Sequence, residues 1–239
     1  MRTSEVIEIA LRKLHTEGYK ISTTKWQGLE SPQPMIEVLN VSLQSDLPQD
    51  QVEAATECSP NLPWADLHFE ERVGGIPSNP GKTYQRWPFW RGGFIKEGYF
   101  DHTYMERLNT NPLMGVRYKY GNLHSVVELL KREPDTRQAF IPVWFPEDTG
   151  VKFGGRVPCT IGYHILIRDG KVHIVYYLRS CDARRHFFDD LYLCARLALW
   201  IRDMVNTELQ MGTMSVHITS FHIFESDSYW LKKTIRCAE

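Results

Sequence analysis

The sequence predicts an α+β fold, in which strands and long helices are mixed along the chain. Its 239 residues suit one domain, residues 1–239, or at most two small ones. Hydrophobic residues make up 42% of the chain, which is enough for a sizeable core and argues against a disordered protein. Segments with strand alternation are interspersed with segments of helical periodicity, an order typical of α+β domains.

The N-terminal part contains one clear helix, one strand and one unusual loop. Apolar residues recur at helical spacing before Gly18, at Val6, Ile7, Ala10, Leu11 and Leu14. Residues 35–43 alternate like a strand. Residues 74–93 are rich in Gly, Pro and aromatic residues, a composition that indicates an ordered loop beside a site rather than a linker.

A β-hairpin is the clearest local signal. Residues 160–167 and 172–178 are rich in β-forming residues, and the turn dipeptide Asp169-Gly170 lies between them. The other expected elements are a helix over 123–131, an extended segment over 138–145, a buried helix over 188–205, a strand over 214–224 and a short helix over 227–236.

Charge and cysteine content restrict the function classes. Lysine and arginine number 28 against 29 acidic residues, so the formal net charge of −1 argues against a dedicated nucleic-acid binder. The five cysteines show no C-x-x-C spacing, so neither a disulfide framework nor a metal site is expected, and a cytoplasmic location fits best. We expect no signal peptide and no membrane span, because no apolar segment is long enough.

Cys159 is the candidate nucleophile. It follows Pro158 at the start of the first hairpin strand, and Arg179 stands at the end of the second strand. Antiparallel pairing brings both residues to one end of the sheet, where the arginine can hold a phosphate and favour the thiolate. Taken alone, a single cysteine is more often a small core residue, so its neighbours decide between the two interpretations.

Six short motifs make the chain resemble the thymidylate synthase superfamily. They are Pro134-Asp135-Thr136-Arg137, Trp144-Phe145-Pro146-Glu147-Asp148, Pro158-Cys159, Arg168-Asp169-Gly170-Lys171, Arg179-Ser180-Cys181-Asp182 and Ser220-Phe221-His222. Each is weak alone, but their order and spacing over residues 111–224 are specific, whereas the N-terminal third matches poorly. The resemblance implies a single thymidylate synthase-like domain with a mixed β-sheet packed against long helices, and a homodimer formed through the sheet.

The resemblance also implies roles for individual residues. Cys159 is expected to add to C6 of a pyrimidine nucleotide, and 5,10-methylenetetrahydrofolate is expected to be the one-carbon co-substrate. No nucleic-acid or membrane partner is implied. The other matching positions are Arg179 and Ser180 for the phosphate, Arg137 for the phosphate across the dimer interface, Asp182 for the substrate and the pterin ring, His222 for a ribose hydroxyl and Tyr118 for active-site water.

The chemistry also needs a group that shuttles protons at the base. The family places a glutamate in a helix before its first tryptophan loop. Asp66 is the best counterpart here, and Glu70, one helical turn later, is the competitor. Both could instead be solvated groups on the outer face of that helix.

Asp190 is the residue expected to select the base. It lies eight positions after Asp182, where uracil-using members of the family have asparagine and cytosine-using hydroxymethylases have aspartate. An ionised carboxylate only accepts hydrogen bonds, so it suits the exocyclic amine of cytosine and repels O4 of uracil. The alternative is that Asp189 and Asp190 complement the dipole at a helix N-terminus.

Further departures from the family concern the product, the sugar and the cofactor. Thr160 and Leu178 replace a histidine and a glutamine of methyl-forming members, and the chain ends at residue 239, so we expect water to capture the one-carbon unit and give a hydroxymethyl group. The remaining departures are Phe224 for a tyrosine that binds the 3′-hydroxyl, His186 for a glycine near the folate and Gln138 for a second arginine.

The sequence therefore predicts a 5-hydroxymethylase that acts on dCMP or CMP. Two alternatives stay open. One is methylation or hydroxymethylation of dUMP, or methylation of dCMP, in the manner of thymidylate synthase. The other is a catalytically inactive superfamily member that acts as a binding protein.

Overall fold

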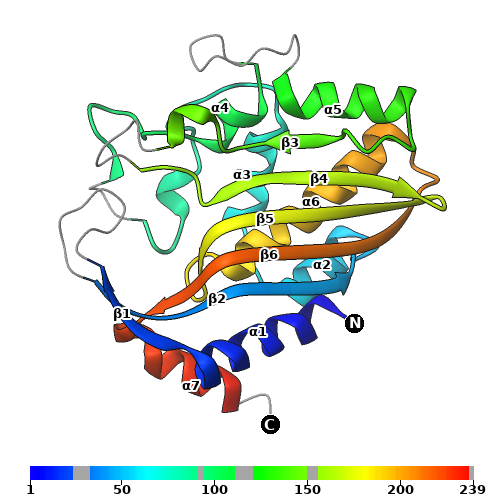
Figure 1. Cartoon of the computed structure of the whole chain (residues 1–239). Helices are drawn as coiled ribbons and strands as arrows, with labels where there is room; N and C mark the ends of the chain where they lie inside the picture. Colours follow the sequence, from blue (N-terminus) through cyan, green and yellow to red (C-terminus); the bar gives the residue numbers. More distant parts are fainter. Residues whose placement is uncertain (24–32, 91–93, 111–120, 150–155, 237–239) are drawn as a thin grey trace.

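The structure is a computed structural model that describes residues 1–23, 33–90, 94–110, 121–149 and 156–236 (Figure 1). Its centre is a six-stranded sheet with the order β1-β2-β6-β5-β4-β3. β5 and β6 pair in parallel and the other neighbours pair antiparallel, so the predicted mixed sheet is confirmed. The strands are β1 (Tyr19–Thr23), β2 (Gln33–Asp46), β3 (Phe140–Pro142), β4 (Thr160–Arg168), β5 (Lys171–Asp182) and β6 (Gln210–Phe224).

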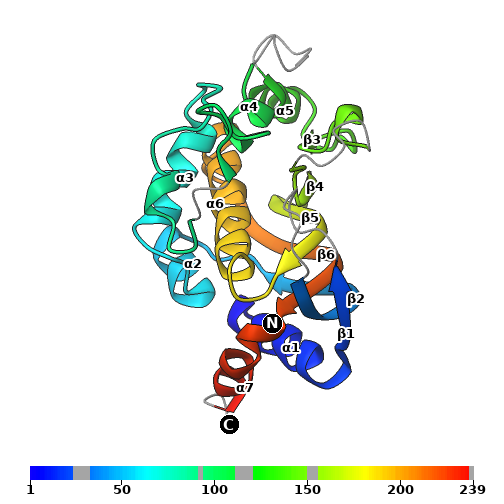
Figure 2. The same ribbon diagram turned by 90° about the vertical axis from the view of Figure 1, so that its left-hand side faces the viewer.

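Helices cover one face of the sheet (Figure 2). The central one is α6 (Phe187–Val205), which connects β5 to β6 and packs on both, because apolar residues occupy most of its surface. None of the described helices is long and apolar enough to cross a lipid bilayer. Packed on α6 are α2 (Gln51–Cys58), α3 (Trp64–Val73) and α5 (Gly121–Arg132), while α1 (Thr3–Glu17) lies on β2, α4 (Tyr104–Leu108) on α3 and α7 (Ser228–Arg236) on α1.

The predicted secondary structure is largely confirmed, and the differences lie in short elements. The N-terminal helix, the hairpin, the long helix and the last strand are present at the expected places, and β2 extends beyond the predicted strand at both ends. β1, α2 and α4 were not predicted from the sequence. β1 has five mostly exposed residues and α4 has five residues, so neither shows a periodicity long enough to detect.

A β-bulge shifts the register of the hairpin near its open end. Along most of its length the pairing follows the Asp169-Gly170 turn, but Thr160 lies opposite Leu178 rather than Arg179. The backbone N–H of Arg179 consequently donates to the carbonyl of Cys159 at 2.9 Å. The prediction that these two residues lie at one end of the sheet is therefore confirmed.

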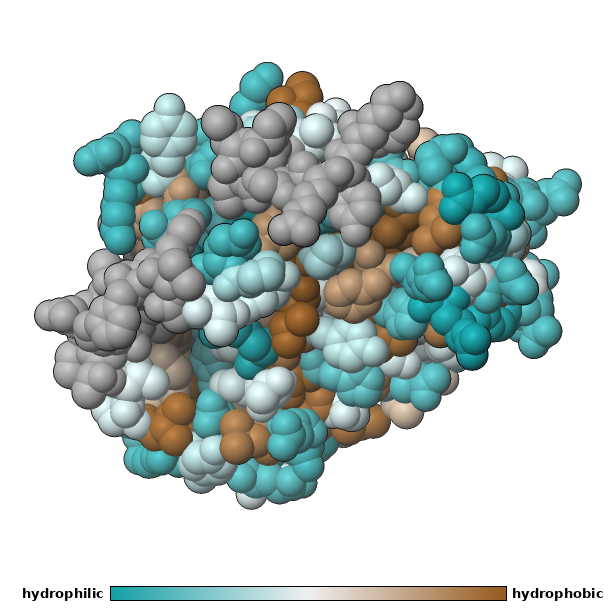
Figure 3. Space-filling model, turned by 45° about the horizontal axis from the view of Figure 1, so that its top comes forward, coloured by the Kyte–Doolittle hydropathy of each residue, from teal (hydrophilic) through white to brown (hydrophobic). Residues whose placement is uncertain are grey.

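The second face of the sheet is covered by no helix of the described part of the chain (Figures 1 and 2). Two large hydrophobic side chains on it are partly exposed, Ile161 at 39% and Phe140 at 38%, and Tyr177 stacks with His217. Figure 3, in which the top of the molecule comes forward, shows hydrophobic groups between hydrophilic ones rather than one continuous apolar surface. A mixed surface of this kind is typical of protein interfaces that form and dissociate as well as of free surfaces.

Arg107 and Asp148 form a buried ion pair that connects α4 to the short 3₁₀ helix at Pro146–Asp148. Both side chains are 1% exposed, and two hydrogen bonds of 2.9 Å join the guanidinium to the carboxylate. Asp148 also accepts the backbone N–H of Phe145, whose ring lies 4.6 Å from the guanidinium of Arg107. Removal of either charge would leave the other without compensation in a nonpolar environment.

We therefore expect Asp148→Asn to lower the free energy of unfolding by about 3–5 kcal/mol, because it leaves the Arg107 guanidinium buried and unpaired. Chemical denaturation followed by circular dichroism measures the change. The matched control is Glu133→Gln, which removes the partner of Arg132 in an exposed pair with side chains 72% and 53% exposed and should cost at most about 1 kcal/mol. Equal effects of the two substitutions would contradict the prediction.

Candidate active site

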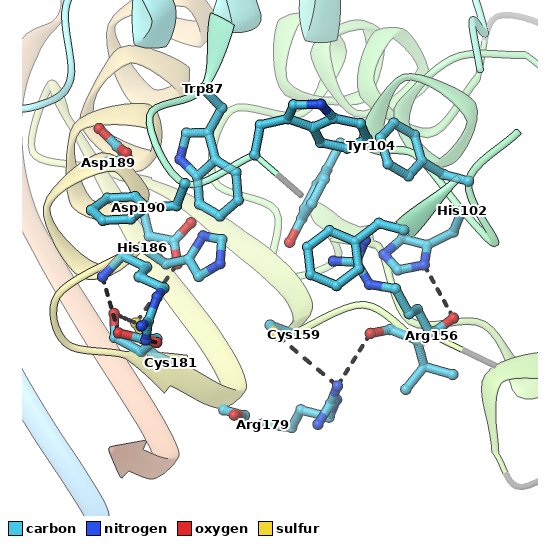
Figure 4. Close-up of a pocket in the computed structure, with 18 of the residues that line it drawn as sticks. Trp87, His102, Tyr104, Arg156, Cys159, Arg179, Cys181, His186, Asp189 and Asp190 are labelled. Atoms are coloured by element: carbon cyan, nitrogen blue, oxygen red, sulfur yellow. Dashed lines mark hydrogen bonds and ion pairs between the residues drawn. The ribbon is translucent and has the colours of Figure 1, made fainter. Parts of the chain in front are cut away.

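A cavity of about 770 Å³ opens at the carboxyl ends of the parallel strands β5 and β6. Its walls come from the ends of β1, β2, β5 and β6, from α3, from the first turn of α6 and from the segment before α4. Figure 4 shows Cys159 between Trp87, His186 and Asp190 on one side and Arg156 on the other. Ligand sites commonly lie at this edge of sheets that contain parallel strands.

Cys159 lies on the cavity wall beside Arg179. The Nη2 of Arg179 is 4.0 Å from the Sγ of Cys159. The Nε and Nη2 groups also donate to the carbonyls of Pro158 and Val157, at 2.8 and 3.1 Å, so the backbone that precedes the cysteine fixes the guanidinium. Within the described part of the chain Nη1 has no hydrogen-bond partner, so it can donate to an anionic ligand.

Arg156 is a second cation of this cavity, and the sequence analysis missed it. Its guanidinium lies over the ring of Phe94 at 4.1 Å, and its backbone N–H donates to Asp101. Its Nε is buried with no hydrogen-bond partner in the described residues. No motif marks this arginine, which lies in irregular structure three positions before Cys159.

The two arginines oppose the effect of burial on the nucleophile. Burial raises the pKa of the Cys159 thiol above its ordinary value, and Asp190 adds to the rise. Arg179 and Arg156 lower the same pKa, with Arg179 the stronger. Since the thiolate is the reactive form of cysteine, these cations determine how much of it forms near neutral pH.

Asp190 lines the cavity from the first turn of α6. Burial raises its pKa to about 7, Asp189 adds to the rise, and Arg72 and the Cys181 thiol, which is 3.7 Å away, oppose it. Asp189 differs from Asp190 in its hydrogen bonds, because both of its oxygens accept from Asn61, at 2.7 and 2.8 Å. Near neutral pH Asp190 therefore exists in its protonated and ionised forms, and only the protonated form can donate a hydrogen bond.

Aromatic rings form another wall of the cavity. Trp64 stacks with His68 at 4.9 Å and lies 6.0 Å from Trp87, which in turn stacks with His186 at 4.7 Å. Burial lowers the pKa of both histidines to about 4, so their rings are neutral at pH 7. His186, at the position of a family glycine, thus extends an uncharged surface on which a planar heteroaromatic group can stack.

Three hydroxyl groups connect the cavity to the sheet. The Tyr104 and Thr160 hydroxyls lie 2.9 Å apart, and the Thr160 and Tyr176 hydroxyls are also 2.9 Å apart. Tyr104 lines the cavity, and the guanidinium of Arg72 lies over its ring at 4.0 Å. Burial raises the pKa of both tyrosines, so all three hydroxyls keep their protons and can form a continuous hydrogen-bonded chain.

The ends of β5 and β6 supply most of the remaining predicted ligands. The Ser180 hydroxyl is 3.5 Å from Nδ1 of His222, and both side chains line the cavity. Asp182 also lines it, but its Oδ1 accepts the backbone N–H groups of Arg184 and Arg185, and its Oδ2 pairs with the Arg185 guanidinium at 2.8 Å. The predicted residues that the structure brings to this one cavity are Cys159, Arg179, Ser180, Asp182, Asp190 and His222.

The two candidate proton-shuttling carboxylates do not line the cavity, so the structure corrects the expected orientation of their helix. Asp66 accepts hydrogen bonds from Tyr192 and Arg196 of α6. The side chain of Glu70 is 67% exposed and lies 3.3 Å from Arg196. Both carboxylates therefore join α3 to α6 on the side away from Cys159.

The face of α3 that does line the cavity carries Trp64, His68 and Arg72, which are four residues apart and hence on one side of a helix. His68 Nδ1 lies 3.5 Å from the Thr83 hydroxyl and 3.9 Å from the Glu71 carboxylate. From the sequence, carboxylates alone were expected to act at this helix. The regular spacing of an aromatic residue and two polar ones is the signal that could have identified these residues.

Two predicted residues remain outside this description of the cavity. Arg137 is exposed and does not line the cavity of its own chain, and its carbonyl lies 3.0 Å from the ring Nε2 of His164, which faces the uncovered side of the sheet. Its role across a dimer interface stays a prediction. Tyr118 lies outside the described residues.

Comparison with known proteins identifies similar sequences. Residues 78–237 match the thymidylate synthase family. The chain is 32% identical over 129 residues to a Methanosarcina barkeri protein described as "Putative thymidylate synthase", and 31% identical over 138 residues to a Methanococcoides burtonii protein with the same description. These alignments cover 54% and 57% of this chain and 55% and 59% of the relatives, so the chain spans about half the length of the curated relatives it matches.

Among solved structures, the chain is similar to thermostable thymidylate synthase A from Bacillus subtilis, with a TM-score of 0.70 and 15% sequence identity. The superposition covers 99% of this chain and 84% of that protein. At this identity the similarity concerns the fold, and it confirms the predicted fold class. Because the family match extends over more than half of its residues, the chain belongs to the thymidylate synthase family.

Proposed function

We propose that this chain transfers a one-carbon unit to C5 of a cytosine nucleoside monophosphate and releases a 5-hydroxymethyl product. The observation that carries the proposal is one cavity that contains the Cys159 thiol, the guanidinium groups of Arg156 and Arg179 and the Asp190 carboxyl group. A nucleophile, cations for a phosphate and a group that reads a base edge are the three requirements of this reaction. The alternatives are thymidylate synthase-type methylation of dUMP and a catalytically inactive binding protein.

Cys159 starts the reaction. Its thiolate adds to C6 of the pyrimidine, which removes the 5,6 double bond and makes C5 nucleophilic. Arg179 and Ser180 hold the phosphate, with Arg156 as a second cation in place of the family arginine that is Gln138 in this chain. The same guanidinium groups favour the thiolate, so binding and activation of the nucleophile use the same residues.

Asp190 selects the base. Its protonated form can donate to N3 of cytosine and accept from the exocyclic amine, and its ionised form still accepts from that amine. Uracil is matched by the protonated form alone, because an ionised oxygen repels O4. Since the pKa of Asp190 is about 7, cytosine is accepted on both sides of neutral pH and uracil only below it.

The aromatic wall fits the folate co-substrate. 5,10-Methylenetetrahydrofolate, when bound, supplies a one-carbon unit at the oxidation level of formaldehyde. The stacked, uncharged rings of Trp87 and His186, with Trp64 tilted against Trp87, offer the aromatic surface that a pterin requires. Asp182, fixed by Arg185, contributes the polar contact to this ring that the resemblance implies.

His68 and the hydrogen-bonded hydroxyl groups of Tyr104, Thr160 and Tyr176 carry the protons in this reaction. C5 bonds to the one-carbon unit and loses its proton, and the bond between that carbon and the folate nitrogen would break with its electron pair and a proton staying on the nitrogen. A water oxygen then joins the transferred carbon, and departure of the Cys159 thiolate restores the 5,6 double bond. No electron pair is taken from the folate, so tetrahydrofolate and not dihydrofolate is released. Neutral His68 on the cavity wall can accept the C5 proton, which replaces the role expected of Asp66 or Glu70.

In this proposal, two copies of the chain form a homodimer through the uncovered faces of their sheets. The partly exposed Phe140 and Ile161 and the stacked Tyr177 and His217 lie on that face. Arg137, which does not reach its own cavity, would then supply a phosphate ligand to the cavity of the second copy.

Cys159→Ser should abolish release of tritium from C5-labelled CMP and dCMP in the presence of methylenetetrahydrofolate. We expect a loss of about 10³-fold or more, because a neutral hydroxyl cannot add to C6 as the thiolate does. Cys58→Ala is the control, since Cys58 is buried in α2 outside the cavity. Mass analysis of the product should show the hydroxymethyl group, and stoichiometric dihydrofolate would instead identify methyl transfer.

Asp190→Asn should shift the ratio of kcat/KM for cytosine over uracil nucleotides toward uracil by at least about 10-fold, because a neutral amide removes the repulsion of O4. Parallel assays with CMP, dCMP, UMP and dUMP measure this ratio. Asp203→Asn is the matched control, because Asp203 lies on the same helix outside the cavity, has a side chain that is 52% exposed and should leave the ratio unchanged. An equal shift in both variants would refute base selection by Asp190.

The same ratio should depend on pH in the wild-type protein. Asp190 is protonated below pH 7 and ionised above it, so discrimination against uracil should increase by up to about tenfold per pH unit above 7. Ionisation of Cys159 affects both substrates equally and cancels in the ratio. In Asp190→Asn the ratio should be independent of pH, and a wild-type ratio that stays flat from pH 6 to pH 9 would contradict the assignment.

A further inference from the structure

A row of polar side chains crosses four strands at the far end of the cavity. In the sheet register Tyr19 of β1 lies opposite Glu37 of β2, Glu37 opposite His222 of β6, and His222 opposite Asp182 of β5. Glu37, His222 and Asp182 line the cavity, and so does Ser220, one step along β6. Directly opposed residues have Cβ atoms about 5 Å apart, so these side chains form one continuous surface.

The row contains two carboxylates, Glu37 and Asp182. In the described part of the chain, Glu37 accepts its hydrogen bonds from hydroxyl groups. Ser220 donates to its Oε1, and Tyr19 donates to its Oε2 at 2.9 Å. Asp182, by contrast, is paired with the Arg185 guanidinium. Each carboxylate oxygen can accept two hydrogen bonds, so Glu37 keeps one acceptor site on each oxygen for a ligand in the cavity.

The chemistry of Glu37 suits a sugar and excludes a phosphate. Two adjacent hydroxyl groups can donate to the two oxygens of one carboxylate, and an acidic residue is a common partner of ribose hydroxyls in nucleotide sites. A phosphate would be repelled there and belongs beside Arg179. The neighbouring His222 has a pKa lowered by burial, so its neutral ring can complete the hydrogen bonds of the second hydroxyl.

We propose that Glu37, with Ser220 and His222, binds the vicinal 2′- and 3′-hydroxyls of the nucleotide and makes the site selective for ribonucleotides over deoxyribonucleotides. The proposal rests on the function proposed above and names the sugar of its substrate. Phe224 is consistent with this proposal, because its ring has no hydroxyl group that could bind the 3′-oxygen. Recognition of the sugar then depends on Glu37 of the neighbouring strand β2. A deoxyribose would leave one oxygen of Glu37 without its donor in a half-buried site.

The test compares CMP with dCMP in the wild type and in Glu37→Gln, by tritium release and by calorimetric binding. The wild type should prefer CMP by about 10- to 100-fold in kcat/KM, as expected for a hydrogen bond to a charged group. Glu37→Gln should lose most of that preference through weaker use of CMP, with dCMP changed little. Glu37→Asp, which keeps the charge but withdraws it from the sugar, should fall between the two.

Tyr19→Phe is the control variant, because it removes the outer hydrogen bond of Glu37 without touching the cavity, and it should keep the preference for CMP. A wild type that uses dCMP as well as CMP, or a preference unchanged in Glu37→Gln, would overturn the sugar assignment. Preferential binding of CMP that depends on Glu37, without any tritium release, would uphold it and overturn the proposed reaction. Absence of binding to either nucleotide would overturn both.

Discussion

The Cys159 thiol shares one cavity with the guanidinium groups of Arg179 and Arg156, and the rest of the site depends on this arrangement. Burial alone would keep Cys159 protonated and unreactive, so the cations must remain close to it. Arg179 is held by the carbonyls of Pro158 and Val157 and not by a carboxylate of the described residues, which would cancel its charge. Its field therefore remains available to the thiolate and to a phosphate.

The relative position of Cys159 and Arg179 depends on a β-bulge in the sheet. Without the bulge near the start of β4, Arg179 would pair with Thr160, and Cys159 would face the next residue of β5. Gly162 makes the local geometry feasible, since a Cβ there would lie 2.6 Å from the carbonyl oxygen of Ile141 and from the ring of Phe140. The close approach of β3 to β4 at this point thus excludes every other residue type.

The features that could be predicted from the sequence are those that local periodicity and ordered motifs determine. The hairpin was predicted because Asp169-Gly170 separates two alternating runs, and Cys159 and Arg179 were placed together by its pairing. Arg156 and Glu37 could not be found in this way, because one lies in irregular structure and the other on a strand whose neighbour, β6, is distant in sequence. The orientation of α3 was missed because the side that faces the cavity depends on packing against α6, where Arg196 binds both Asp66 and Glu70.

The carboxyl groups of the cavity differ in whether the protein already pairs them or leaves them for a ligand. Asp182 is paired with Arg185, and Asp189 is hydrogen-bonded by Asn61. Asp190 is hydrogen-bonded by the Cys181 thiol, and Glu37 is hydrogen-bonded by two hydroxyl groups. An unpaired buried carboxyl group is costly unless a ligand supplies its hydrogen bonds.

A nucleotide has three chemically different ends, a dianion, a base edge and a diol. The cavity offers cations to the dianion and separate carboxyl groups to the base edge and the diol. Sorting of this kind favours one monomeric nucleotide over a nucleic-acid strand, whose repeated phosphates would have to pass both carboxyl groups.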